Sequence, residues 1–398
     1  MNLLKKYALK IDLPSEILNV IKTIEQNGFE AYVAGGAVRD FLMKRKVSDY
    51  DITTSATPDD IRRIFKKCFD TGIKHGTVTV VTKNFHVEIT TYRIDGKYQN
   101  HRRPESVSFS KNLADDVSRR DFTVNALVYN PKDGVLDFFS GLDDIKNKKV
   151  RAVGDANLRF FEDALRIIRA VRFACNLGFE IEKSTFDAMK NNCKYLLDIS
   201  AERIRSEFTK ILCAKDVSPF SYAAKEGIFD GIFPDIKNIE SFDKISLSYG
   251  DYCVKWALFI YYMNKNRAEK ILSKYKFSNA EKQKIKFFIR AAEFKFTKGR
   301  KDLKRFLQKN DLYLDGLEFF MNAIGKFYPA DMIGEIINSS EPYKISMLAI
   351  SGNDVKNCAK TSADIGKILN YLLDFVIENP DKNEKERLLE MAEKFYDN

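Results

Sequence analysis

Histidine is scarce in this chain of 398 residues, and cysteine forms no metal-binding pattern. All three histidines (His75, His86 and His101) precede residue 102, so a phosphohydrolase module built on His and Asp ligands has no histidine further along the chain. The six cysteines are scattered without a C-x-x-C pair, which indicates neither a zinc site nor a disulfide framework. We therefore expect reduced thiols.

Long apolar runs are also missing. No stretch approaches the roughly 18 apolar residues of a membrane-spanning helix. The first residues, "MNLLKKYALKIDLP", have neither the apolar core nor the cleavage site of a signal peptide. We therefore expect a cytoplasmic protein that has no membrane partner.

Acidic residues are outnumbered: 66 Lys and Arg face 56 Asp and Glu, which gives a net charge of +10 and a pI near 9.0. This balance favours a polyanionic partner, with nucleic acid as the leading candidate. The length is sufficient for a large core and roughly two to four domains.

Helices and strands alternate over the first 145 residues. The stretch "PSEILNVIKTIEQNG" has the apolar spacing of a helix, and "TPDDIRRIFKKC" begins with Thr57 as N-cap and Pro58 in the first turn. The stretches "HGTVTVVT" and "HVEITTYR" read as strands. From about residue 155 the strand signal fades, and long helical patterns with aromatic faces predict a helical remainder with those rings in its core.

The stretch "AYVAGGAVRDFLMKRKVSDYDITT", residues 31–54, combines two candidate features. A short buried strand, a glycine pair and a helix start would expose backbone N–H groups to a phosphate at Gly36, and Arg39 adds a forked donor. In an extended segment, Asp49 and Asp51 would point to the same face, and paired carboxylates of this kind suit Mg²⁺. The alternatives are an ordinary strand-to-helix turn and a polar loop.

Glu88 lies on the polar face of the strand "HVEITTYR". It would complete a carboxylate cluster with Asp49 and Asp51. The alternative is an isolated, solvated glutamate.

The stretch "FEDALRIIRAVRFACNLGF", residues 161–179, predicts a helix that carries Asp163, Arg166, Arg169 and Arg172 at steps of three. Cytosine and adenine both present an amino donor beside a ring-nitrogen acceptor, and a carboxylate beside a guanidinium matches that pattern. Uracil and guanine present the reverse order, which would leave polar groups unsatisfied. The alternative is an i,i+3 surface ion pair between Asp163 and Arg166.

Two further basic stretches carry weaker signals. In "SRRDFTVNAL", Arg119, Arg120 and Asp121 suit a triphosphate and a ribose hydroxyl, although the stretch alone is a charged helix start. In "FKFTKGRKDLKRF", residues 294–306, Phe side chains alternate with Lys and Arg, which would suit an RNA backbone. We favour a solvated amphipathic helix for the second stretch.

Taken in order, "GGAVRD", "DYD", "RRDFTVNAL", "EDALRIIRAVRF" and "SAERIRSEFTKIL" resemble the successive motifs of class II CCA-adding enzymes, the tRNA nucleotidyltransferases of the polymerase β superfamily. Further on, "LAISGNDVK" and "IGKILNYLLDFVIENPDKNEKERLL" resemble the C-terminal tail of that family, so the resemblance covers nearly the full chain. One departure is the stretch "TSADIG", where the family usually has a Pro-Gly pair before Ile-Gly.

The resemblance implies an α+β fold, in which a small mixed α/β nucleotidyltransferase head is followed by an all-helical neck, body and tail. We expect the head at residues 1–145, the neck with its nucleotide-selecting helix at 146–205, the body at 206–294 and a tRNA-binding tail at 295–398. The implied activity is template-independent addition of CCA to the 3′ end of tRNA from CTP and ATP, by two-metal nucleotidyl transfer with Mg²⁺. No protein partner is implied.

The resemblance also implies roles for individual residues. Asp49 and Asp51 would bind the metals, with Glu88 as a third catalytic carboxylate. The implied nucleotide-binding residues are Gly36, Arg39 and Arg120, the base-reading pair Asp163 and Arg166, and Arg169 and Arg172, which would complete the pocket.

Several alternatives stay open at this point. The loop "RIDGKYQNHRRPESVSF" disfavours an enzyme that adds only CC, because such relatives lack it, whereas an A-adding enzyme would keep it. Bacterial poly(A) polymerases share the head but carry a Pro after "ED" and a longer basic tail. A non-enzymatic RNA-binding protein would need a broken carboxylate pair, and the long basic helical half disfavours nucleotidylation of a small molecule.

Overall fold

The computed structural model describes residues 4–72, 76–96, 106–236, 250–297, 299–310, 313–339 and 341–396, and the backbone alone at 98–99 and 103–104. The chain forms two compact units. Unit 1 comprises Met1–Ser246 and Ser273–Lys276, and unit 2 comprises Leu247–Leu272 and Phe277–Asn398. The finer division into head, neck, body and tail stays a prediction. Among the described residues, no helix is both long and apolar enough to cross a membrane.

The head of unit 1 is built on an eight-stranded sheet of order β1-β12-β11-β2-β3-β6-β5-β4. Its strands are β1 (Lys5–Tyr7), β2 (Ala31–Ala34), β3 (Asp51–Thr54), β4 (Cys68–Gly72), β5 (Thr77–Val81), β6 (His86–Thr91), β11 (Leu127–Asn130) and β12 (Gly134–Asp137). Neighbouring strands are antiparallel except β3 and β6, which run parallel. The three strands predicted from "AYVA", "HGTVTVVT" and "HVEITTYR" are therefore confirmed.

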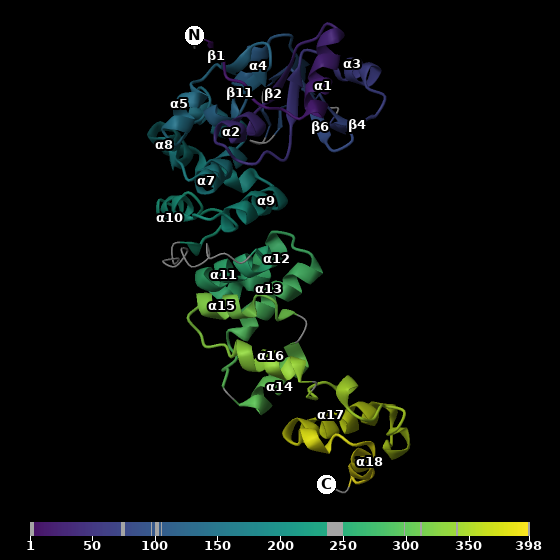
Figure 1. Ribbon diagram of the computed structural model, residues 1–398. Helices are drawn as coiled ribbons and strands as arrows, with labels where there is room; N and C mark the ends of the chain where they lie inside the picture. The colour runs from purple at the N-terminus through teal and green to yellow at the C-terminus, as the bar shows by residue number, and fades with distance from the viewer. Residues whose placement is uncertain are drawn as a thin grey trace. The chain divides into compact units, whose positions relative to one another are not determined.

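Both faces of this sheet are covered. Helices α1 (Ser15–Gln26) and α3 (Pro58–Ile64) pack with one face, and α4 (Leu113–Ser118) packs with the other (Figure 1). Val33 of β2 faces α1, whereas its neighbour Ala34 faces α4, as the alternation of a strand requires. The predicted Thr57 cap is present as a capping box with Asp60.

Other short elements surround the head sheet. Helices α2 (Gly36–Leu42) and α5 (Gly141–Lys146) and the 3-10 turn η2 (Thr123–Asn125) follow strands of the sheet or connect them. Strand β7 (Arg93–Asp95) pairs with β10 (Val107–Phe109), and β8 (Tyr98–Gln99) pairs with β9 (Arg103–Pro104).

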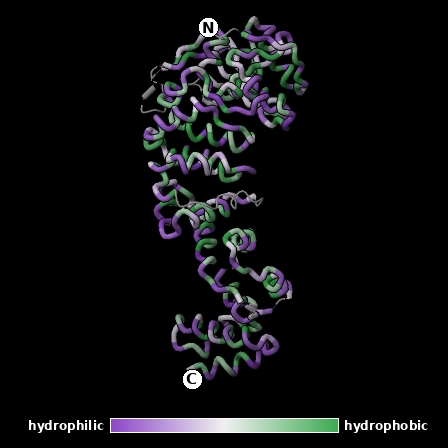
Figure 2. The backbone as a smooth tube through the Cα atoms, turned by 90° about the vertical axis from the view of Figure 1, so that its left-hand side faces the viewer, coloured by the Kyte–Doolittle hydropathy of each residue, from purple (hydrophilic) through white to green (hydrophobic). Residues whose placement is uncertain are grey.

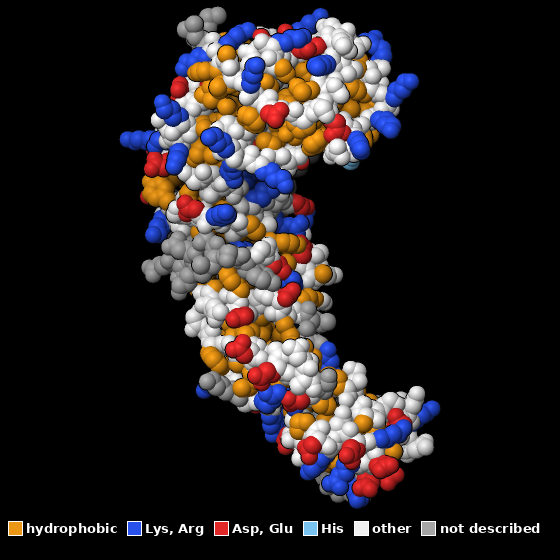
Figure 3. All heavy atoms as spheres, viewed as in Figure 1, with side chains coloured by type: hydrophobic (Ala, Val, Ile, Leu, Met, Phe, Trp, Pro, Cys, Tyr) orange, Lys and Arg blue, Asp and Glu red, His pale blue; other side chains and the backbone are white. Residues whose placement is uncertain are grey.

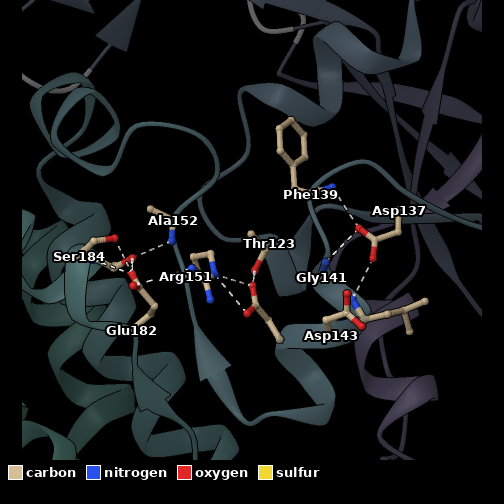
Figure 4. Close-up of polar contacts among 12 residues, drawn as sticks. Thr123, Asp137, Phe139, Gly141, Asp143, Arg151, Ala152, Glu182 and Ser184 are labelled. Atoms are coloured by element: carbon tan, nitrogen blue, oxygen red, sulfur yellow. Dashed lines mark hydrogen bonds and ion pairs between the residues drawn. The ribbon is translucent and has the colours of Figure 1, made fainter. Parts of the chain in front are cut away.

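The remainder of unit 1 is mainly helical. It contains α6 (Ala156–Glu162), α7 (Leu165–Leu177), α8 (Lys183–Asn192), η3 (Cys193–Asp198), α9 (Ala201–Leu212) and α10 (Ser218–Lys225). A short parallel pair, β13 (Lys149–Val150) with β14 (Glu180–Ile181), lies among them. Arg151 joins the two regions, because its guanidinium lies 3.1 Å from the carboxylate of Asp144 on α5 and 3.8 Å from Glu182 before α8 (Figure 4).

The single helix predicted over residues 161–179 is wrong. Helix α6 ends at Glu162, Asp163 is extended at φ −137° and ψ 99°, and α7 begins at Leu165. The Asp163 carboxylate accepts a hydrogen bond from the Leu165 N–H at 3.1 Å, so it satisfies a free donor at the start of α7. Aspartate favours such local bonds over a helix interior, which explains the break.

Unit 2 is helical in its described residues, and hydrophobic and hydrophilic positions alternate along its helices (Figure 2). Its helices are α11 (Tyr252–Asn264), α12 (Ala268–Lys274, whose last two residues belong to unit 1), α13 (Asn279–Ala291), α14 (Arg300–Asn310), α15 (Leu317–Ala323), α16 (Ala330–Asn338), α17 (Ser362–Glu378) and α18 (Lys385–Glu393). Trp256 is fully buried, with the rings of Phe259 and Phe277 edge-on to it. The aromatic faces are core, as predicted.

The turn after α2 contains a strained lysine. Lys44 has φ 55°, a left-handed conformation that costs a residue with a side chain about 1 kcal/mol. We expect Lys44→Gly to stabilise unit 1 relative to Lys46→Gly by about 1 kcal/mol, because both changes loosen the unfolded chain but only the first relieves strain. Urea unfolding followed by circular dichroism measures the difference, and equal midpoints would contradict this reading of the turn.

Candidate active site

The predicted carboxylates come together near the start of strand β3. Asp51 begins β3, and Glu88 of β6 lies directly opposite it in the parallel register. The pKa of Asp51 is raised, first by surrounding protein that displaces water, and then by the charges of Glu88 and Asp49, while Arg120 opposes the shift. The structure therefore brings Glu88 and Asp49 close enough to Asp51 to repel its carboxylate, with Arg120 beside it.

This donor set fits a divalent cation only in part. Among the residues that the structure describes, no three His, Cys, Asp or Glu side chains are arranged to hold a metal ion by themselves. Crowded carboxylate oxygens are nevertheless the ligands that Mg²⁺ prefers, and it commonly takes its remaining ligands from water and substrate phosphates. Asp49 and Asp51 are the residues that would hold it, with Glu88 adjacent.

The glycine pair lies beside Arg120. Gly35 has φ 70°, a backbone conformation that favours glycine, and a Cβ added there would lie 3.0 Å from the Arg120 guanidinium, which would have to shift slightly. Gly36 opens α2, as predicted. Arg39 is nearly buried: it pairs with Asp40 at 2.9 Å and donates to the side-chain oxygen of Asn125 at 2.5 Å.

The arginines of "RRDFTVNAL" share one buried acid. Arg119 and Arg120 lie 2.5 and 3.2 Å from the carboxylate of Asp116, which is fully buried. Burial opposes ionisation of Asp116, but the two arginines hold its pKa below the ordinary value. Sequence analysis missed Asp116, although its i,i+3 and i,i+4 spacing to the arginines was a usable signal.

Asp163 and Arg166 do not pair with each other, so the alternative of a surface ion pair between them is wrong. Asp163 pairs with Arg203 of α9 at 2.8 Å. Arg166 pairs with Glu162 at 2.8 Å and donates to the Arg119 carbonyl at 2.9 Å. Arg203 and Glu162 were missed, although both lie in quoted motifs.

Arg169 and Arg172 are tied to two further acids. Arg169 lies 2.6 Å from Asp121, and Arg172 lies 3.0 Å from Glu207 of α9. Burial would raise the pKa of Asp121, but Arg169 and the Asn125 amide outweigh it and lower the pKa to about 2. Because Asn125 also accepts from Arg39, a continuous polar chain runs from α2 to α7.

Aromatic and basic side chains of the stretch at 294–306 contact other residues of unit 2. Phe294, Phe296 and Phe306 pack on one another with ring centroids 4.8 to 4.9 Å apart. Four basic residues of α14 form ion pairs with acids of unit 2: Arg300 with Glu335, Lys301 with Glu378, Lys304 with Glu341 and Arg305 with Glu378. On the face drawn in Figure 3, basic and acidic side chains lie among one another in each unit. This arrangement supports the preferred interpretation of an amphipathic helix.

Three family models match successive segments of the chain. Residues 31–151 match the model described as "Poly A polymerase head domain", residues 178–240 the model described as "Probable RNA and SrmB- binding site of polymerase A", and residues 251–392 the model described as "tRNA nucleotidyltransferase domain 2 putative". The CCA-adding enzyme of Lactobacillus delbrueckii subsp. bulgaricus is 36% identical, over 94% of this chain and 96% of that protein. The CCA-adding enzyme of Streptococcus mutans is 33% identical, over 97% and 99%.

Solved structures agree with these matches. The Bacillus stearothermophilus CCA-adding enzyme, crystallised with CTP, has a TM-score of 0.82 and 29% identity, and the match covers 96% of this chain and 97% of that one. The Thermotoga maritima CCA-adding enzyme in complex with tRNA has a TM-score of 0.67 at 22% identity, with 98% and 99% covered, which shows a common fold. With matches along nearly its whole length, the chain belongs to the CCA-adding enzymes, a family of tRNA nucleotidyltransferases.

Proposed function

We propose that this protein completes the 3′ end of tRNA with CCA, taking CTP and ATP as substrates and using no nucleic-acid template. The observation that carries the proposal is the grouping of the Asp49, Asp51 and Glu88 carboxylates with Arg120 beside them. Family membership supports the same activity. A tRNA substrate also favours a cytoplasmic location.

In the reaction, the 3′ oxygen of the tRNA attacks the α-phosphorus of the nucleotide. The new O–P bond forms as the bond from the α-phosphorus to the oxygen that bridges to the β-phosphate breaks, the hydroxyl proton passes to solvent, and pyrophosphate leaves. Asp49 and Asp51 would hold divalent cations, for which we propose Mg²⁺; bound there, the ions neutralise phosphate charge and polarise the reacting oxygens. Arg39 and Arg120 hold the nucleotide phosphates in place.

Asp163 and Arg166 select the base, because both keep hydrogen-bonding capacity for a ligand. The three bonds described for Arg166 use both N–H groups of Nη1 and one of Nη2. The Nε–H and the second Nη2–H have no described protein partner and remain for a ring nitrogen. The Asp163 carboxylate, oriented by Arg203, would accept from the amino group of C or A.

The test uses three tRNA transcripts, which end at the discriminator nucleotide, at C and at CC. The proposal predicts that CTP extends the first two, that ATP extends the third, and that addition stops at CCA. An A-adding enzyme would act only on the third transcript, and a poly(A) polymerase would continue past the first A. No addition to any transcript would refute the proposal.

We propose that the loop after β7 acts in the switch from adding C to adding A. Residues 97 and 100–102 lie outside the described residues. Because the same pocket must change shape to accept the larger base, we expect deletion of residues 95–102 to leave CC addition within a few-fold of normal and to stop the final A. Denaturing gels of transcripts ending at the discriminator and at CC measure both steps. A deletion variant that completes CCA would show that the loop is not the switch.

A further inference from the structure

One aromatic ring lies among three arginines of the nucleotide site. Phe173 of α7 is 8% exposed. The guanidinium carbons of Arg172, Arg39 and Arg169 lie 4.1, 5.3 and 5.4 Å from the centroid of its ring. Arg39 comes from α2 in the head, whereas Arg169 and Arg172 come from α7 itself, so the ring joins two elements far apart in the sequence.

Three positive charges gathered at this distance repel one another. Each arginine has an acid nearby: Asp40 for Arg39, Asp121 for Arg169 and Glu207 for Arg172. These acids do not set the orientation of every guanidinium. Arg172 Nε and Glu207 Oε2 are 3.0 Å apart, yet both are buried without a hydrogen-bond partner, so their ion pair lacks hydrogen-bond geometry. Arg172 therefore needs a further contact to set its orientation.

The Phe173 ring supplies such a contact. An aromatic face attracts a guanidinium electrostatically and accepts its planar stacking, and this attraction is stronger where water is excluded. Phe122, which is fully buried, packs against Phe173 with ring centroids 5.7 Å apart and planes at 75°, and this contact fixes the plane of the ring. The ring is thus a neutral, rigid surface in the middle of three like charges.

We propose that Phe173 is a positioning residue, whose ring sets the spacing of Arg39 relative to Arg169 and Arg172 and so shapes the site for the nucleotide phosphates. The inference rests on the proposed function, because it takes Arg39 as a phosphate ligand. It assigns Phe173 no part in base reading, which belongs to Asp163 and Arg166. Loss of the ring is therefore expected to weaken phosphate binding and to leave base choice intact.

The test compares Phe173→Leu with Phe186→Leu. Phe186 of α8 is also 8% exposed and also has a cation near its ring, with Lys190 Nζ 5.6 Å from the centroid, but it belongs to no part of the proposed site. Inorganic tripolyphosphate serves as the probe, because it competes for the phosphate site and carries no base. We expect its inhibition constant to rise about tenfold in Phe173→Leu and less than about twofold in Phe186→Leu. The preference for CTP over UTP should stay unchanged in both.

Two further variants separate the effect of the aromatic face from the effect of side-chain volume. Phe173→Tyr keeps the aromatic face and should retain tripolyphosphate affinity. Phe173→Met fills similar space without a ring; it should behave as Phe173→Leu and takes its place if that variant fails to fold by circular dichroism. Equal inhibition constants in Phe173→Leu, Phe186→Leu and the unaltered protein would overturn the inference. Absence of nucleotide addition by the unaltered protein would instead overturn the proposed function.

Discussion

Replacing Asp51 with alanine is expected to lower the rate of nucleotide addition by about a thousandfold or more, and Asp49→Ala should act similarly. A metal ion contributes several kcal/mol to transition-state stabilisation, and each 1.4 kcal/mol is about tenfold in rate. Losing a metal ligand therefore removes most of the catalysis. The rate is measured as single-turnover addition of C to a tRNA transcript.

The fold should survive this change. Asp51 is crowded by Glu88 and Asp49, so alanine removes a repulsion rather than a stabilising contact. We therefore expect an unchanged or raised Tm and largely retained tRNA binding. Asp59→Ala is the matched control, since Asp59 is an exposed carboxylate of α3 paired only with Arg62 among the described residues, and it should keep full activity. Addition at a near-normal rate by Asp49→Ala or Asp51→Ala would contradict the assignment of these residues as metal ligands.

Asp163→Ala and Arg166→Ala are expected to erase much of the preference for CTP and ATP over UTP and GTP. An unsatisfied polar group at a buried contact costs roughly 1 to 3 kcal/mol, so each lost contact should reduce the kcat/KM ratio by about 5- to 150-fold. The measurement is kcat/KM for CTP and UTP on a transcript ending at the discriminator.

The ion pair between Asp163 and Arg203 requires its own control. Arg203→Ala removes the partner of Asp163 but none of the atoms proposed to read the base. We expect this variant to lower kcat/KM for CTP while it keeps a larger share of the selectivity than Asp163→Ala. If Asp163→Ala and Arg166→Ala both retained normal selectivity, the two residues would be structural only.

Local sequence patterns predicted the elements that depend on neighbouring residues. The buried strand before Gly35, the Thr57 cap and the apolar face of α1 all follow from spacing within one element. Strand alternation placed Glu88 on the polar face of its strand, but its approach to Asp51 was one of two open alternatives, which the family resemblance favoured.

Asp116 and Glu162 were missed although they lie close in sequence to the arginines with which they pair, whereas other missed contacts join distant elements. No pattern near Arg172 indicates that Glu207 lies beside it, and the partnership of Asp163 with Arg203 requires α9 to pack on α7. The break at Asp163 was hidden because the apolar spacing continues across it, while a side-chain bond to Leu165 ends the helix locally. The acids that pair with α14 lie in other segments of unit 2, on α16, on α17 and at Glu341, and the sequence around α14 does not indicate them.

The central claim is that this site builds CCA from CTP and ATP alone. The most direct measurement incubates the purified protein with a tRNA transcript ending at the discriminator, all four nucleoside triphosphates and Mg²⁺, and then sequences the 3′ ends. The account predicts ends of C, CC and CCA that converge with time on CCA, with no U or G and no further extension. Ends that contain U or G, a run of A, or no added nucleotide would contradict it.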